Sequence, residues 1–112
     1  MNWPDDVDGD VFRGLNESGF DFSKEVEVDF NLDFHYWPLR EETIKFLFNE
    51  FPNGEVVEPD EEDLAEGIDK GYFTFSVKTL LTYEFVMGMQ EQLTNMLSKY
   101  DGYCESWGVM QD

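Results

Sequence analysis

The clearest pattern in the chain is an unbroken alternation of polar and apolar residues from Glu25 to Tyr36. A period of two sends successive side chains to opposite faces of a β-strand, so this segment predicts a long strand with one buried and one solvated face. Strands of a sheet that is covered on both faces are apolar throughout, so we expect this sheet to be open on one side. The residues predicted to face the core are Val26, Val28, Phe30, Leu32, Phe34 and Tyr36.

Apolar residues at helical spacing predict three helices. The first lies within residues 8–19, where acids crowd the first turn and Gly19 suits the position just past the helix end. The second follows Pro38 over residues 39–50, and the third is capped by Thr82 and reaches Lys99. Their predicted apolar sides are Val11, Phe12 and Leu15 in the first, Ile44, Leu47, Phe48 and Phe51 in the second, and Val86, Met89, Leu93, Met96 and Leu97 in the third.

Three shorter strands complete the predicted elements, over residues 55–58, 72–78 and 103–110, with an acidic and mobile loop over 60–71. After the first helix the order is β-α-β-β-α-β, which is the order of the ferredoxin-like plait. We therefore expect one α+β domain over residues 1–112, with a four-stranded antiparallel sheet in the order 4-1-3-2 and two helices on one face.

The net charge of the chain gives the strongest indication of which binding partners it has. The chain has 26 acidic and 7 basic residues among 112, a net charge of −19, yet 17% of its residues are aromatic. Disordered acidic segments are poor in aromatic residues, so a folded core must lie beneath a negative surface. Such a surface attracts basic partners and repels nucleic acid and anionic membranes. The acids gather at the N-terminus, on the outer side of the long strand and over residues 58–69.

The sequence gives little support to catalysis. His35 is the sole imidazole, and no serine or cysteine has a visible base partner. Cys104 is alone, which excludes an internal disulfide and argues against a cysteine-based zinc site. Carboxylate pairs such as Glu27 and Asp29 are expected by chance among so many acids. We expect no catalytic residues and no cofactor.

An acidic spacing near the N-terminus matches part of a calcium loop. Asp6, Asp8, Asp10 and Glu17 take the spacing of EF-hand ligands, but Val11 stands where that loop needs glycine. An acid-rich helix start is the favoured interpretation, and we expect no metal site. The chain also shows no signal peptide and no apolar run long enough to span a bilayer, so we expect a cytoplasmic protein.

A row of carboxylates is the best candidate for binding a partner. RNA binding on a plait needs basic residues on the open sheet face, whereas the outer side of the long strand is acidic. That face suits a basic segment of a protein, because guanidinium groups pair with carboxylates. Tyrosine and tryptophan would add apolar anchors, although the alternation does not decide which sheet face holds the tryptophan near the end. The candidate binding residues are Glu25, Glu27, Asp29, Asp33, Tyr72 and Trp107.

Several local patterns are shared with one known family. They are Leu15, Gly19 and Asp21, the alternating strand 26–34, Gln90 and Leu93 in the long helix, Tyr100-Asp101-Gly102, and Trp107-Gly108. On these patterns and the element order, the chain resembles the regulator of ribonuclease E activity B (RraB-like) family. The resemblance implies a ferredoxin-like α+β fold, an acidic character and a non-enzymatic role. It also implies a protein partner, with ribonuclease E as the candidate, and inhibition of RNA cleavage.

Two other functions stay open on the sequence. A small molecule or metal ion could be bound by the same fold, or the open sheet face could serve self-association of a structural subunit. The oligomeric state is not fixed by the sequence, and a monomer is favoured.

Overall fold

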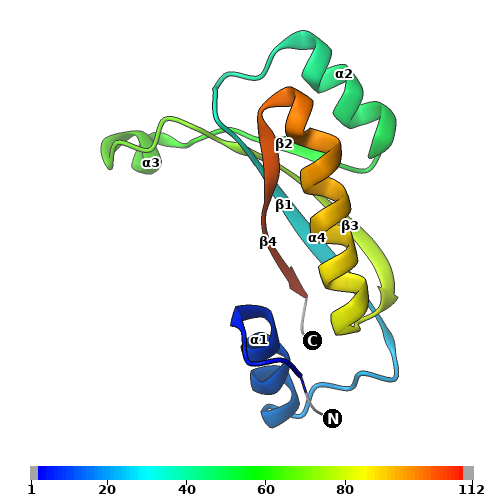
Figure 1. Ribbon diagram of the computed structural model, residues 1–112. Helices are drawn as coiled ribbons and strands as arrows, with labels where there is room; N and C mark the ends of the chain where they lie inside the picture. Colours follow the sequence, from blue (N-terminus) through cyan, green and yellow to red (C-terminus); the bar gives the residue numbers. More distant parts are fainter. Residues whose placement is uncertain (1–2, 110–112) are drawn as a thin grey trace.

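The centre of the molecule is a four-stranded antiparallel sheet, seen in a computed structural model that describes residues 3–109 (Figure 1). The strands are β1 (Glu25–Phe34), β2 (Glu55–Val57), β3 (Tyr72–Leu80) and β4 (Gly102–Val109). Their order is β2-β3-β1-β4, and each neighbouring pair is antiparallel. This is the predicted order 4-1-3-2 read from the other edge, so the α+β class and the strand order are confirmed. Position 110, in the predicted last strand, lies outside the described residues.

The alternation in β1 has the predicted effect. Val28, Phe30, Leu32 and Phe34 are buried, and the residues between them are exposed or half-buried. The strand is shorter than predicted, because the chain leaves the sheet after Phe34. Tyr36, beyond its end, still packs against the core.

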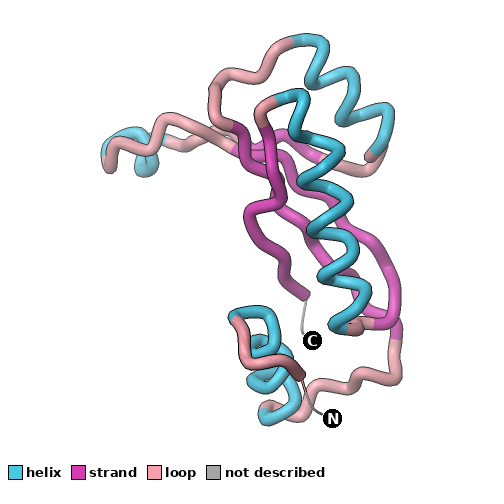
Figure 2. The backbone as a smooth tube through the Cα atoms, in the orientation of Figure 1, coloured by secondary structure: helices cyan, strands magenta, loops and turns pink. Residues whose placement is uncertain are grey.

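Two helices cover the buried face of the sheet. Helix α4 (Tyr83–Leu97) lies along the strands, and a short 3₁₀ turn, η1 (Ser98–Tyr100), extends it (Figure 2). The predicted cap is confirmed, because the Thr82 side chain accepts a hydrogen bond from the Phe85 amide at 3.1 Å. Helix α2 (Glu41–Glu50) packs near one end of the sheet, where Phe48 meets the ring of Phe73 edge-on at 5.4 Å. Phe48 is nevertheless 40% exposed, so its assignment to the core was wrong.

Helix α1 (Val7–Glu17) closes the other end of the core. Phe12 and Leu15 are buried as predicted, but Val11 is 42% exposed, and its predicted burial was wrong. The third buried residue of α1 is Gly9, which lies against the Pro4 carbonyl. A Cβ atom added to Gly9 would lie 1.9 Å from the Pro4 carbonyl oxygen. Because the N-terminal segment packs so closely on this glycine, the helix turns Val11 toward solvent.

The connection between β2 and β3 forms an arm, residues 58–71, that projects away from the sheet (Figure 1). It contains a one-turn helix, α3 (Glu61–Ala65), where the sequence predicts a loop. The Asp60 side chain accepts from the Asp63 amide while the Asp63 side chain accepts from the Asp60 amide, which is a capping box.

Candidate protein-binding surface

The outward side chains of β1 form the acidic face, defined here as Glu25, Glu27, Asp29, Asn31 and Asp33. Neither α2 nor α4 covers this side of the sheet, because both pack on the phenylalanine side of β1 and β3. Since β1 has β3 on one side and β4 on the other, the acidic face runs along the middle of the sheet. Four of the predicted binding residues are therefore placed in one row.

Cross-strand hydrogen bonds hold the centre of the acidic face. The Ser76 hydroxyl of β3 donates to the Asp29 carboxylate, and the Asn31 amide donates to the Ser106 hydroxyl of β4 at 3.0 Å. Glu25 and Glu27 make no side-chain hydrogen bond within the described residues, and both are exposed. These two carboxylates are consequently the ones available to a partner.

The acidic face is short of positive charge. Among residues 3–109, ion pairs involve only Arg13, Lys24 and Lys45, and none includes a carboxylate of the acidic face. Lys78 stands opposite Glu27 in the register of β1 and β3, yet the two side chains form no ion pair. A basic partner would thus meet carboxylates that form no ion pair within the described residues.

The far end of the acidic face concentrates negative charge. Burial raises the pKa of Asp33, the Glu105 carboxylate raises it further, and Lys70 acts in the opposite direction. Tyr103 lies opposite Asp33, with its ring 5.2 Å from that of His35. Burial also raises the pKa of Tyr103, with added effects of Asp33 and Glu105. A bound cation would relieve this repulsion.

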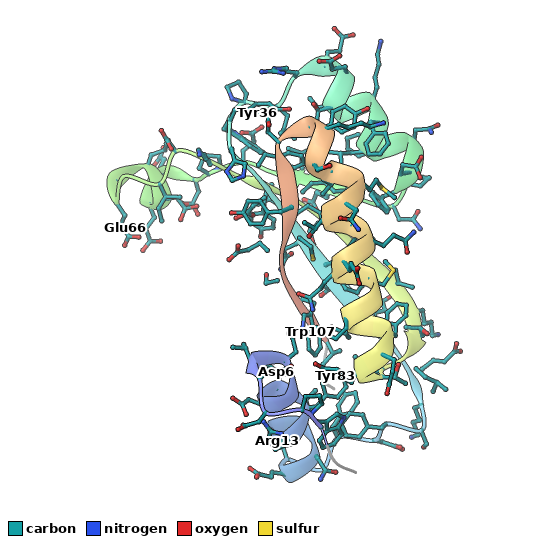
Figure 3. The ribbon with its side chains drawn as sticks, viewed as in Figure 1. Asp6, Arg13, Tyr36, Glu66, Tyr83 and Trp107 are labelled. Carbon is teal, nitrogen blue, oxygen red and sulfur yellow. The ribbon has the colours of Figure 1, made fainter. Side chains whose placement is uncertain are left out.

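Of the two predicted anchors, only Tyr72 shares this side of the sheet. It alternates with buried Phe73 and pairs with Val57 of β2. Trp107 lies on the opposite side: it pairs with Phe30, and its ring is 5.4 Å from that of Phe12 in α1. Figure 3 shows it beside the first turn of α1, where its indole N–H donates to Asp8 at 2.8 Å. Trp107 therefore lies on the core face and outside the acidic face, which answers the question of its position that the alternation left open.

A β-bulge explains the position of Trp107. Asn31 pairs with Ser106 and Leu32 pairs with Cys104, so Glu105 is an extra residue in β4. The bulge reverses the alternation after Cys104, which separates Tyr103 on the acidic face from Trp107 on the core face. Without the extra residue, strict alternation would put Tyr103 and Trp107 on the same side.

The arm carries a second set of acids. Seven acidic residues lie within 58–69, and Figure 3 shows Glu66 far from the sheet. Two hydrogen bonds fix its base: the Trp37 indole donates to Glu58 at 2.9 Å, and the Lys70 ammonium donates to the His35 carbonyl at 3.0 Å. The Asp60-x-x-Asp63 spacing of the capping box was the available signal for α3.

Three observations concern the candidate metal ligands and the lone thiol. Within residues 3–109, no three histidine, cysteine or acidic side chains converge as a metal site would require. Asp6, the first residue of the calcium-loop spacing, caps α1 by accepting from the Gly9 amide at 2.6 Å. Burial raises the pKa of Cys104 to about 11, which disfavours the reactive thiolate.

Fold and surface together define a small acidic α+β protein whose sheet presents a row of carboxylates that form no ion pair among residues 3–109. A family model described as regulator of ribonuclease activity B, RraB, matches residues 5–109. The chain belongs to this family, which confirms the resemblance seen in the sequence. A search of curated proteins found no match. None of the helices in the described part of the chain has the length and apolar character needed to cross a membrane.

Proposed function

We propose that this protein is a non-enzymatic regulator that binds a basic segment of a protein partner through its acidic face. The partner we propose is a ribonuclease, with ribonuclease E as the candidate, and the consequence of binding is altered RNA degradation in the cytoplasm. The family description supports the ribonuclease. The observation that carries the binding mode is the row of carboxylates on β1, which form no ion pair within the described part of the chain.

The exposure of Glu25 and Glu27 suits them to this role. Exposed carboxylates lose little solvation when a partner approaches, and arginine can pair with them through two parallel hydrogen bonds. Exposed pairs each contribute little affinity, about 0.2–1 kcal/mol, so the main effect of the net charge is to speed association and to reject acidic competitors such as RNA. Tyr72 supplies an apolar contact at the edge of the same face.

We also propose that the architecture is a variant of the ferredoxin-like plait. The β-α-β-β-α-β order of the main elements, the strand order and the placement of α2 and α4 on one face support this assignment. In this arrangement the acidic face is the side on which other plaits bind their ligands.

Reversal of charge on the acidic face tests the proposal. The double variant Glu25→Lys/Glu27→Lys should bind a scaffold segment of ribonuclease E about 10-fold more weakly in calorimetric titration at low salt, because two pairs of about 0.7 kcal/mol each are lost.

The matched control is Glu17→Lys/Glu91→Lys, which changes the net charge equally but alters exposed positions on α1 and α4. It should keep most of the affinity. Equal losses in the two variants would mean that net charge alone acts, and an absence of binding by the unaltered protein at low salt would refute the proposed partner.

A further inference from the structure

The outer edge of β3 is mostly unpaired. β3 has nine residues, but β2 pairs with only Tyr72, Phe73 and Thr74. On the other side, β1 pairs along β3 from Phe73 to Leu80. Residues 75–80 therefore form a sheet edge, which we call the free edge, and Figure 2 shows this half of β3 at the margin of the sheet.

The free edge offers main-chain hydrogen-bonding groups. In an antiparallel strand, alternate residues direct both N–H and C=O to the same side, so three of these six residues direct theirs away from β1. Within the described residues, no hydrogen bond reaches the backbone of the free edge from that side. Proteins usually block such edges with charges, proline or bulges, and here Lys78 is the single charged residue in the stretch.

A hollow of about 240 Å³ lies beside the free edge. Its walls include Phe51, Phe75, Val77 and Met89, and the turn of Pro52 and Asn53 borders it beside residues 75–77. The rings of Phe51 and Phe75 stack at 4.1 Å, which makes one wall rigid. The hollow is suited to an apolar side chain from a strand placed next to β3.

We propose that the free edge binds an extended basic segment of a protein partner by strand addition, with one apolar side chain of that segment in the hollow. Main-chain hydrogen bonds would give affinity, and alternate side chains would give specificity. The inference rests on the proposed function and deepens it by naming the conformation in which the basic segment binds.

Charge selects a basic partner segment over a second copy of this chain. Two copies that each carry −19 would repel one another at close range. Neighbouring strands are about 4.8 Å apart, so an added strand would lie about 10 Å from β1, within the combined reach of an arginine and a glutamate side chain. Arginines on its outward side would extend across β3 toward Glu25 and Glu27. Lys78, which stands opposite Glu27, places one positive charge on that side, so the arginine nearest Leu80 and Glu25 makes the better pair.

A set of designed peptides tests the inference. The probe is a capped seven-residue peptide of alternating arginine and valine, titrated into the ¹⁵N-labelled protein. We expect amide shifts and slowed hydrogen exchange at residues 75–80. Two further peptides, N-methylated at either the odd or the even positions, should differ in affinity about 10-fold, because only one set of N–H groups faces β3.

The outcomes separate this inference from the proposed function. Shifts confined to the acidic face, with equal affinity for the two methylated peptides, would overturn strand addition and leave the proposed function standing. A neutral peptide, with threonine for arginine, that binds the free edge as tightly as the basic one would support the edge and refute the electrostatic role. No binding of either peptide would overturn the inference.

A pair of methionine variants checks the hollow. Met89→Lys places a cation in its wall and should weaken the arginine–valine peptide about 10-fold. Met87→Lys alters an exposed position on the same helix and should leave the affinity unchanged. If the Met89→Lys variant does not fold, the two methylated peptides still test strand addition on the unaltered protein.

Discussion

At the scale of single residues, a few hydrogen bonds join α1 to the rest of the molecule. The Tyr83 hydroxyl of α4 donates to Asp6 at 2.6 Å (Figure 3). Gln90 of α4 and Trp107 of β4 both donate to Asp8, at 3.3 and 2.8 Å. Carboxylates at the start of α1 therefore interact favourably with the positive end of the helix dipole, and they also hold the helix against α4 and β4.

The bond between Tyr83 and Asp6 predicts a pH-dependent effect of Tyr83→Phe. The tyrosine hydroxyl lowers the pKa of Asp6, and the same bond raises the pKa of Tyr83 to about 12. Because the pKa of Asp6 is lower in the folded protein than in the unfolded chain, Asp6 stabilises the fold at pH values above its unfolded-state pKa. This stabilisation is lost as the pH falls through the folded-state pKa. Because the pKa of Tyr83 is higher in the folded protein, Tyr83 stabilises the fold at pH values below its unfolded-state pKa. This stabilisation is lost as the pH rises toward 12.

We therefore expect Tyr83→Phe to lower the Tm between about pH 5 and 9, and this difference to shrink on acidification and above about pH 10. Thermal unfolding followed by circular dichroism across pH measures it. Tyr72→Phe removes a hydroxyl that makes no hydrogen bond within the described residues, and should leave the Tm unchanged. A pH-independent difference for Tyr83→Phe would mean that ring packing, rather than this bond, is responsible.

At the scale of elements, the docking of α1 depends on one aromatic side chain. Phe12 is 1% exposed, and its ring lies within 6.0 Å of the rings of Trp3, Phe22, Tyr83 and Trp107. The cluster joins four separate segments of the chain. Its loss would free α1 and uncover the end of the core.

Phe12→Ala should lower the free energy of unfolding by about 3–5 kcal/mol, the usual cost of removing a fully buried phenylalanine. Val11→Ala, at the adjacent exposed position, should change it by less than about 0.5 kcal/mol. Urea denaturation of both variants provides the measurement. Similar costs at the two positions would contradict the orientation of α1.

The elements also show which features a sequence can reveal. The alternation in β1 spans a whole strand, so it predicted the acidic face and the positions of Glu25 and Glu27. The orientation of Val11 depends on the contact of Gly9 with Pro4, and the position of Trp107 depends on one extra residue in β4. Periodicity averages over several residues, so it does not register a single packing contact or bulge. The free edge depends on the relative lengths of β2 and β3, which only their pairing defines.

At the scale of the whole molecule, charge opposes the compact state. The net charge is −19, and the ion pairs among residues 3–109 involve only three cations. These pairs are solvent-exposed and contribute little to stability. We therefore expect long-range repulsion among carboxylates to exceed local attraction, and salt to relieve it.

We expect the Tm to rise by about 5 °C between 0.01 and 0.15 M NaCl, as the Debye length falls from about 30 to about 8 Å. Calorimetric scans at fixed pH measure the change. The variant Glu25→Lys/Glu27→Lys lowers the magnitude of the net charge by four and should respond less to salt. A Tm that is constant or falls with salt in the unaltered protein would show that repulsion does not limit its stability.

The bulge at Glu105 changes how this chain should be aligned with its relatives. In an alignment, a one-residue gap in a surface loop changes only the length of the loop. A gap at Glu105 instead moves every later side chain of β4 to the opposite face of the sheet. In a relative without the extra residue, the counterpart of Trp107 would join the acidic face and α1 would lose its indole contact. The number of residues between Gly102, where β4 begins, and the tryptophan is therefore the marker that we expect to distinguish family members that dock α1 as this one does.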